Sequence, residues 1–388
     1  MPTHTRIESI DILRALTMLF MLWVNDFSTL SEVPKWLAHG PAGENYIGFS
    51  DLIFPLFLFV VGMSIPLALQ IRLDKNHSSW SITKHILIRG ASLLLIGVFI
   101  VNYEIAHNAT IVFGSQWWGF IMALGVVLIW IDWRKSPIAQ KFYLPIQCIG
   151  VCLLVFLAFV YSGGENGELG MRTHWWGILG LIGWAYLANS LLALISRNKL
   201  LISIVFFVIF NILSILNFAG PLSELPGVLS YFGTVLQGFI PTFTAAGVVS
   251  TLLIQHFRQK SQILTFWILL LFAAINILYA FLMQPYYWMI YKLGVSIAFS
   301  IICYAMLYFL VEIKGFTKWA SFFTAAGTAT LTCYLIPYFY YPMREITGLR
   351  LPDMLNSGSI GLLVSFGYAY LVVLLASYME KSGFKLKL

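Results

Sequence analysis

Apolar stretches of about twenty residues recur from one end of this chain to the other, and they constrain its fold more than any other feature. A helix of that length crosses the hydrocarbon core of a bilayer. The sequence is 60% hydrophobic and only 10% charged, whereas a soluble domain carries about a quarter charged residues. We therefore predict an all-α, polytopic membrane helical bundle, because a barrel would show only a weak alternating pattern.

The pattern predicts about twelve transmembrane helices within a single domain that covers residues 1–388. The expected spans are 9–28, 51–71, 83–103, 116–133, 142–161, 175–196, 200–219, 231–256, 262–283, 287–311, 318–339 and 358–379.

Lysine and arginine are distributed unevenly over the loops between these spans. The loops expected on one side carry most of the cations, whereas the stretches 104–115, 220–230 and 284–290 on the other side carry no Lys or Arg. By the positive-inside rule, both termini are expected in the cytoplasm. The net charge of +7 follows from this bias, and it predicts contact with the anionic headgroups of a lipid bilayer rather than with nucleic acid.

Polar residues gather between the first two predicted spans. Asn25 lies at the outer end of the first span, Asp51 lies at the outer start of the second, and His39 lies between them in a segment rich in Gly and Pro. A neutral imidazole can take a proton from a nucleophile or accept an acyl group, and a carboxylate or amide nearby would fix its tautomer. Taken alone, these residues favour a plainer interpretation, a histidine in a solvated loop with Asp51 as a helix N-cap.

The order of residues in this region is more informative than their types. The relevant stretches are Arg6-Ile-Glu-Ser-Ile-Asp11-Ile-Leu-Arg14, Val24-Asn25, His39 and Asp51-Leu-Ile-Phe-Pro55, followed by Arg89, Gly97 to Asn102, and Val311-Glu312-Ile313-Lys314-Gly315 leading to Gly327. This order resembles the heparan-α-glucosaminide N-acetyltransferase family and its bacterial relatives. The first 62 residues are the specific part of the resemblance.

The resemblance implies an acetyl-CoA-dependent transmembrane N-acetyltransferase that acetylates the amine of a glucosamine-type sugar, placed in the bacterial inner membrane. It implies that His39 is the catalytic histidine, that Asn25 is the asparagine ending the first span, and that Asp51 is the aspartate of the Asp-Leu-x-Phe-Pro motif. Acetyl-CoA would be a cosubstrate. Association into a homodimer is left open.

Coenzyme A carries several phosphate charges and is made in the cytoplasm, so cations at the inner ends of the spans are candidates to bind it. These candidates are Arg14, Arg72, Lys84 and Arg89. Snorkelling and topology explain Arg72 and Lys84 fully, whereas Arg14 and Arg89 lie within their spans. No metal site is expected, because His77 and His85 are too isolated.

A cofactor from the cytoplasm and a histidine on the outer side require a polar passage between the helices. Both direct transfer, with His39 as the base, and a route through an acetyl-histidine fit the residues. Two other functions remain open: a secondary transporter of a sugar or another small solute, and a membrane O-acyltransferase with a different acceptor. We see no symmetry between the halves of the chain, and intramembrane carboxylates are nearly absent, so a transporter is disfavoured.

Overall fold

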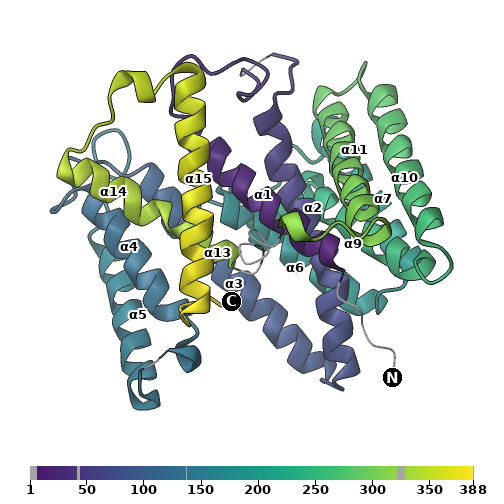
Figure 1. The fold of residues 1–388 in the computed structure, drawn as a ribbon. Helices are drawn as coiled ribbons and strands as arrows, with labels where there is room; N and C mark the ends of the chain where they lie inside the picture. Colours follow the sequence, from purple (N-terminus) through teal and green to yellow (C-terminus); the bar gives the residue numbers. More distant parts are fainter. Residues whose placement is uncertain (1–6, 42–43, 137, 321–326, 328, 388) are drawn as a thin grey trace.

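The computed structural model describes residues 7–41, 44–136, 138–320, 327 and 329–387. Within these ranges the regular structure is helical, and the only β-pairing consists of isolated bridges, which confirms the predicted all-α class (Figure 1). The long helices are α1 (Glu8–Phe27), α2 (Phe49–Asp74), α3 (Ser79–Glu104), α4 (Ser115–Trp130), α5 (Tyr143–Phe159), α6 (Ile178–Ser196), α7 (Leu200–Phe218), α9 (Phe239–Phe257), α10 (Gln262–Met283), α11 (Trp288–Tyr308) and α15 (Gly358–Lys381). Shorter helices are α8 (Gly233–Leu236), α13 (Thr330–Leu335) and α14 (Pro337–Thr347).

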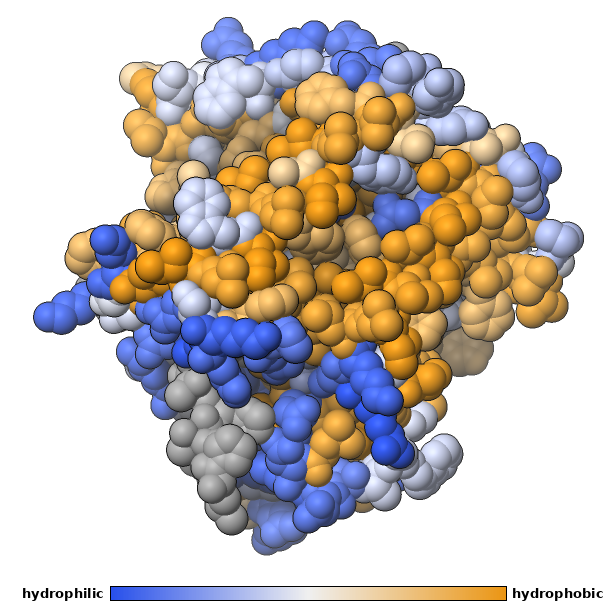
Figure 2. All heavy atoms as spheres, turned by 90° about the vertical axis from the view of Figure 1, so that its right-hand side faces the viewer, coloured by the Kyte–Doolittle hydropathy of each residue, from blue (hydrophilic) through white to orange (hydrophobic). Residues whose placement is uncertain are grey.

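In the described part of the chain, nine helical segments are long and apolar enough to cross a membrane. Helix α1 is not one of them, because Asp11, Arg14 and Asp26 interrupt its apolar character. Helix α4 is apolar but has only 16 residues. Figure 2 shows a broad band of hydrophobic residues on one face, with hydrophilic residues gathered above and below it. Nine of the expected spans thus have support, and the count of twelve stays a prediction.

The span predicted at 318–339 differs most from the structure. Its described residues form a short 3-10 turn at Lys318–Ala320 and then helices α13 and α14, while 321–326 and 328 lie outside the described residues. Pro337 divides α13 from α14, since proline has no backbone N–H to continue the helical hydrogen bonds. Helix α14 then continues to Thr347, well beyond the predicted end.

Helices α2 and α9 pack backbone to backbone near the centre of the molecule. A Cβ atom added at Gly62 would lie 1.9 Å from the carbonyl oxygen of Thr244, and one added at Gly247 would lie 2.0 Å from that of Phe59. Small residues allow such close approach between helices that share an apolar environment. The two glycines therefore hold α2 and α9 together.

The connection between α1 and α2, residues 28–48, lies at the top of Figure 1, and the turn between α2 and α3 lies at the bottom. The connection is tied to the start of α15, because Ser31 donates its N–H to the carbonyl of Asn356 at 3.2 Å and accepts from the N–H of Gly358 at 3.1 Å. The connection that carries His39 is thus held against a part of the fold that is far away in sequence.

Candidate active site

Asp51 lies in the first turn of α2 and organises the preceding connection. Its Oδ2 atom accepts hydrogen bonds from the backbone N–H groups of Gly40 at 2.9 Å and Gly48 at 3.0 Å. Its Oδ1 atom lies 3.2 Å from Nδ1 of His39 and 2.9 Å from Nζ of Lys292. The predicted pairing of His39 with Asp51 is therefore present. Asp51 also accepts the backbone N–H of Gly48, the residue that precedes α2.

The exposure of these side chains differs greatly. The Asp51 side chain is 9% exposed, whereas that of His39 is 59% exposed. With Nδ1–H donated to the carboxylate, Nε2 of His39 would keep its lone pair on a largely exposed ring. Asp51 can thus orient the imidazole and stabilise the imidazolium that forms when Nε2 takes a proton.

Lys292 is part of this site and is not among the residues predicted from the sequence. It comes from α11, 241 positions from Asp51, and its side chain is 23% exposed. A lysine inside an apolar helix was the signal available in the sequence, because such residues mark partners or functional sites by default.

The remainder of the connection is held by its own polar contacts. Ser50 donates its hydroxyl to the carbonyl of Leu37 at 2.6 Å. At the surface, Nζ of Lys35 lies 2.9 Å from Oε2 of Glu44, and this hydrogen bond raises the pKa of Lys35 above its ordinary value. Exposed pairs of this kind add little stability, so the buried contacts of Asp51 and Ser50 determine the shape of the loop.

Asn25 does not belong to the same cluster. It lines a separate space of about 310 Å³, which we call the Asn25 cavity. Its lining consists of Leu22, Asn25, Ser28, Tyr103, Glu104, Ile178, Tyr334, Pro337, Tyr338, Tyr341 and Pro342. His39 and Asp51 are not in this lining, so the structure brings two of the three predicted catalytic residues together and places the third in a cavity.

A second space of about 500 Å³, the Arg14 cavity, collects cations from three parts of the chain. Arg14 and Arg89 line it, as the sequence led us to expect, whereas Arg72 and Lys84 do not. Lys385, from the tail after α15, also lines it and was not predicted as a binding residue. The remaining lining is largely apolar and includes Met18 and Met21 of α1, Leu67 of α2 and Leu179 of α6.

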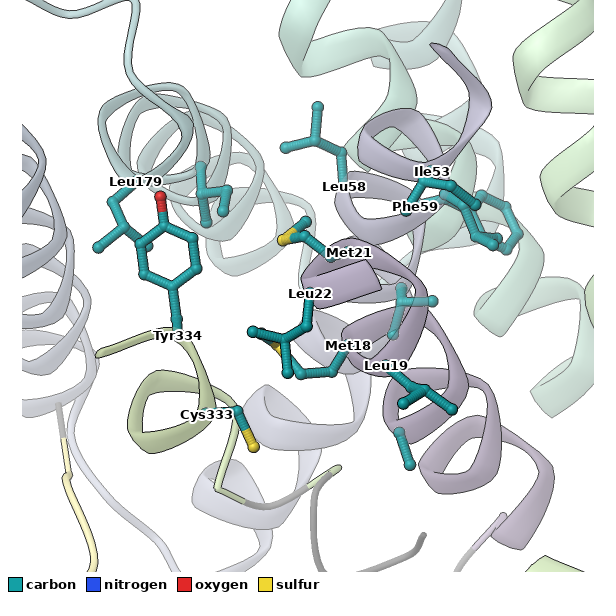
Figure 3. Packing of buried hydrophobic residues seen from close by; sticks show 14 of the residues in the cluster. Met18, Leu19, Met21, Leu22, Ile53, Leu58, Phe59, Leu179, Cys333 and Tyr334 are labelled. Carbon is teal, nitrogen blue, oxygen red and sulfur yellow. The ribbon is translucent and has the colours of Figure 1, made fainter. Parts of the chain in front are cut away.

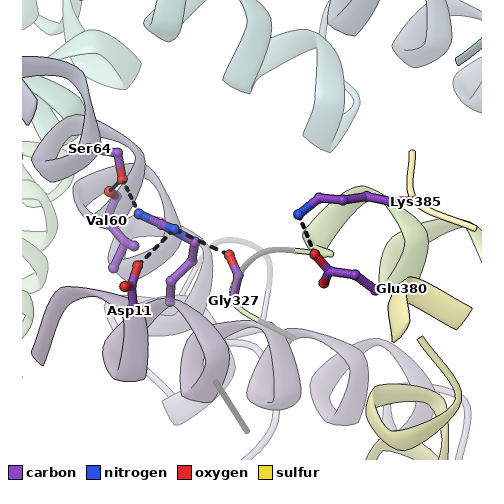
Figure 4. Close-up of polar contacts among 7 residues, drawn as sticks. Asp11, Val60, Ser64, Gly327, Glu380 and Lys385 are labelled. Atoms are coloured by element: carbon purple, nitrogen blue, oxygen red, sulfur yellow. Dashed lines mark hydrogen bonds and ion pairs between the residues drawn. The ribbon is translucent and has the colours of Figure 1, made fainter. Parts of the chain in front are cut away.

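The cations of the Arg14 cavity are held by specific contacts. Nη1 of Arg14 lies 3.2 Å from Oδ1 of Asp11 and 3.3 Å from the carbonyl oxygen of Gly327, and Nη2 lies 2.7 Å from the hydroxyl of Ser64 (Figure 4). Lys385 pairs with Glu380 (Figure 4). The guanidinium of Arg89 stands 4.9 Å from the ring centre of Tyr186, a cation–π arrangement.

The two cavities share a wall. Ile178 and Tyr334 line both of them. Figure 3 shows the Tyr334 ring reaching from α13 toward Leu179, beside the α1 residues Met21 and Leu22. The hydroxyl of Tyr334 lies 3.5 Å from that of Tyr338, so the wall has a polar edge.

Among the residues that the structure describes, no group of three His, Cys, Asp or Glu side chains meets in a way that could hold a metal ion.

The chain is similar in sequence to known proteins. Residues 6–221 match the model of the family described as heparan-alpha-glucosaminide N-acetyltransferase, catalytic, and this match covers more than half of the chain. The chain is also 31% identical over 97 residues to human heparan-alpha-glucosaminide N-acetyltransferase. That alignment covers 25% of this chain and 14% of the human protein, so the chain spans only a small part of its relative's length. The family match includes the connection with His39 and Asp51, and on its basis this chain belongs to the heparan-alpha-glucosaminide N-acetyltransferase catalytic family.

Proposed function

We propose that this protein is a transmembrane acetyltransferase of a bacterial inner membrane, acting as a single domain. It moves an acetyl group from cytoplasmic acetyl-CoA to the amine of a glucosamine-type sugar on the outer side. The observation that carries the proposal is the pair of cavities that meet at Ile178 and Tyr334, one lined by cations and the other by Asn25. The family membership supplies the reaction class.

In this proposal the Arg14 cavity receives coenzyme A. Arg14 and Arg89 offer planar donors that suit phosphate oxygens, and Lys385 adds a third positive charge. The apolar remainder of the lining suits the pantetheine arm. We leave Arg72 and Lys84 out of the proposed cofactor site, because they do not line this cavity.

The acetyl group would pass the shared wall at Tyr334 and Ile178 toward the Asn25 cavity. In direct transfer, the amine nitrogen attacks the thioester carbonyl carbon, the C–N bond forms and the C–S bond breaks. Asn25 would donate a hydrogen bond to the oxygen that becomes negative in the transition state. His39, oriented by Asp51, would act as the base, or in a two-step route would carry the acetyl group on Nε2.

The experiment uses purified protein in sealed vesicles with labelled acetyl-CoA and an amino sugar. We expect His39→Ala to abolish acetyl transfer while acetyl-CoA binding is kept. His174→Ala, which changes a histidine in another connection, is the matched control and should retain activity. Turnover close to wild type in His39→Ala would remove His39 from the mechanism.

The same preparation separates the alternatives. An O-acyltransferase would give an ester that alkaline hydroxylamine cleaves, whereas an amide survives. A transporter of sugars has no reason to bind the thioester, so saturable acetyl-CoA binding would argue against transport.

A further inference from the structure

The Asn25 cavity contains a carboxylate that the mechanism above does not use. Glu104 is the last residue of α3, and it is the one charged side chain among the residues that line this cavity. Its contact with Tyr338 is long, because the hydroxyl of Tyr338 lies 3.5 Å from Oε1 of Glu104. No cation within the described ranges forms an ion pair with it, unlike Asp51 and Glu312, which pair with Lys292 and Arg258.

Aromatic rings surround the same space. Tyr103, Tyr334, Tyr338 and Tyr341 all line the cavity. Their orientations are restrained by one another and by neighbours: Tyr103 stacks on Trp118 with an interplanar angle of 5°, and Tyr338 meets Tyr103 edge-on at 6.1 Å. Ring faces attract cations electrostatically and pack against the apolar faces of ligands.

A lone carboxylate in an aromatic-lined cavity is suited to a compact organic cation. We propose that the Asn25 cavity binds the acceptor in its ammonium form, and that Glu104 both pairs with this ammonium and takes its proton. The inference rests on the proposed function, which it deepens by naming the charge of the acceptor and the group that recognises it. The volume of about 310 Å³ is at the low end for ligand pockets, so the part of the acceptor that enters is small.

The proton balance of the reaction requires such a base. The ammonium nitrogen holds three protons and the amide product holds one, so two must leave. Glu104 takes the first, which frees the nitrogen lone pair for attack on the thioester carbonyl. The second leaves the nitrogen as the C–S bond breaks and ends on the sulfur of coenzyme A, and in direct transfer His39 would relay it. Glu104 then releases its proton to water at the mouth of the cavity.

The positions of Glu104 and His39 give the two residues different roles. His39 does not line it, whereas Glu104 and Asn25 both do. One carboxylate for the ammonium and one amide for the carbonyl oxygen would place both reacting groups within the same space. If the reaction follows the two-step route, His39 carries the acetyl group and Glu104 still prepares the amine.

The test measures binding separately from turnover, using the full chain in lipid nanodiscs. D-glucosamine is the charged probe and D-glucose is the neutral one, which has a hydroxyl in place of the ammonium. We expect the wild type to bind glucosamine at least ten-fold more tightly than glucose. Glu104→Gln should remove this preference, and Glu104→Asp, which keeps the charge, should retain part of it. Glu168→Gln, an exposed carboxylate in the 160–177 connection, is the matched control.

Unchanged acetyl-CoA affinity and an unchanged melting temperature would show that Glu104→Gln is folded. Equal affinity of wild type and Glu104→Gln for glucosamine would overturn the proposal, as would a wild type that binds both sugars equally or neither. Charge-selective binding without any acetylation would instead refute the proposed function and leave the cation site standing. In active protein, the KM for the amine should rise at least ten-fold in Glu104→Gln.

Discussion

The contact between Asp51 and Lys292 gives a prediction whose size follows from the geometry. The two charges are 2.9 Å apart, and their side chains are 9% and 23% exposed. At an effective dielectric constant of about 20, charges at this distance attract by roughly 6 kcal/mol. Desolvation of both groups offsets much of that energy, so we expect a net coupling of about 1–3 kcal/mol in the free energy of unfolding.

A double-mutant cycle measures this coupling. Asp51→Asn and Lys292→Met each leave a partly buried charge without its partner, so each alone should destabilise the protein by about 2–4 kcal/mol. The double variant removes both charges and should be less destabilised than the sum of the single changes. Asp51→Asn also affects Gly40, Gly48 and His39, so its single cost should be the larger.

The assay is reversible unfolding of the purified variants in mixed micelles, followed by circular dichroism. Acetyl transfer is recorded in parallel, because a variant that is stable but inactive would indicate a role for Asp51 beyond packing. Additive destabilisation, with a coupling below about 0.5 kcal/mol, would refute the reasoning. The salt bridge would then contribute no more than an exposed surface pair.

Three further predictions use matched controls. Arg89→Ala should weaken acetyl-CoA binding at least ten-fold at low salt, and the effect should shrink as salt rises. Arg72→Ala, outside the cavity, should leave acetyl-CoA binding unchanged. Equal acetyl-CoA affinity of Arg89→Ala and wild type would show that Arg89 only sets the topology. Gly62→Leu should prevent folding, because the new side chain would clash with the backbone of α9. Gly367→Leu, with open space around it, should leave the melting temperature nearly unchanged. A cysteine in place of Asn45 should react with an impermeant thiol reagent from outside intact cells, whereas a cysteine in the α2–α3 turn should react only after lysis.

The helices were largely predictable because hydrophobic segments of bilayer length are a strong signal. The exception, the predicted span at 318–339, contains Pro337, which divides it, and the helix after the proline runs on to Thr347. Hydrophobicity alone cannot show where such an irregular segment bends. Likewise the charges within Glu8–Phe27 could be read in the sequence, but their partners Ser64 and Gly327 could not.

The candidate site was predictable only where it is local in sequence. Asp51 and His39 are 12 positions apart, and the glycines between them let the backbone fold onto the carboxylate. Lys292 joins them from 241 positions away, and no pattern within the connection indicates that pairing. Tyr334 and Lys385 come from the last part of the chain, beyond the residues that carry the family resemblance.

The close packing of α2 on α9 has a mechanical consequence. Because Gly62 and Gly247 bring the two backbones into direct contact, the helices cannot slide past each other without a steric clash, and they form a stationary frame. In the proposed function, a passage between the two cavities would instead open at their shared wall, where α13 is only 6 residues long and ends two residues before Pro337. Because Tyr334 lines both cavities, a change of its side-chain rotamer would alter the wall between them without any movement of α2 against α9.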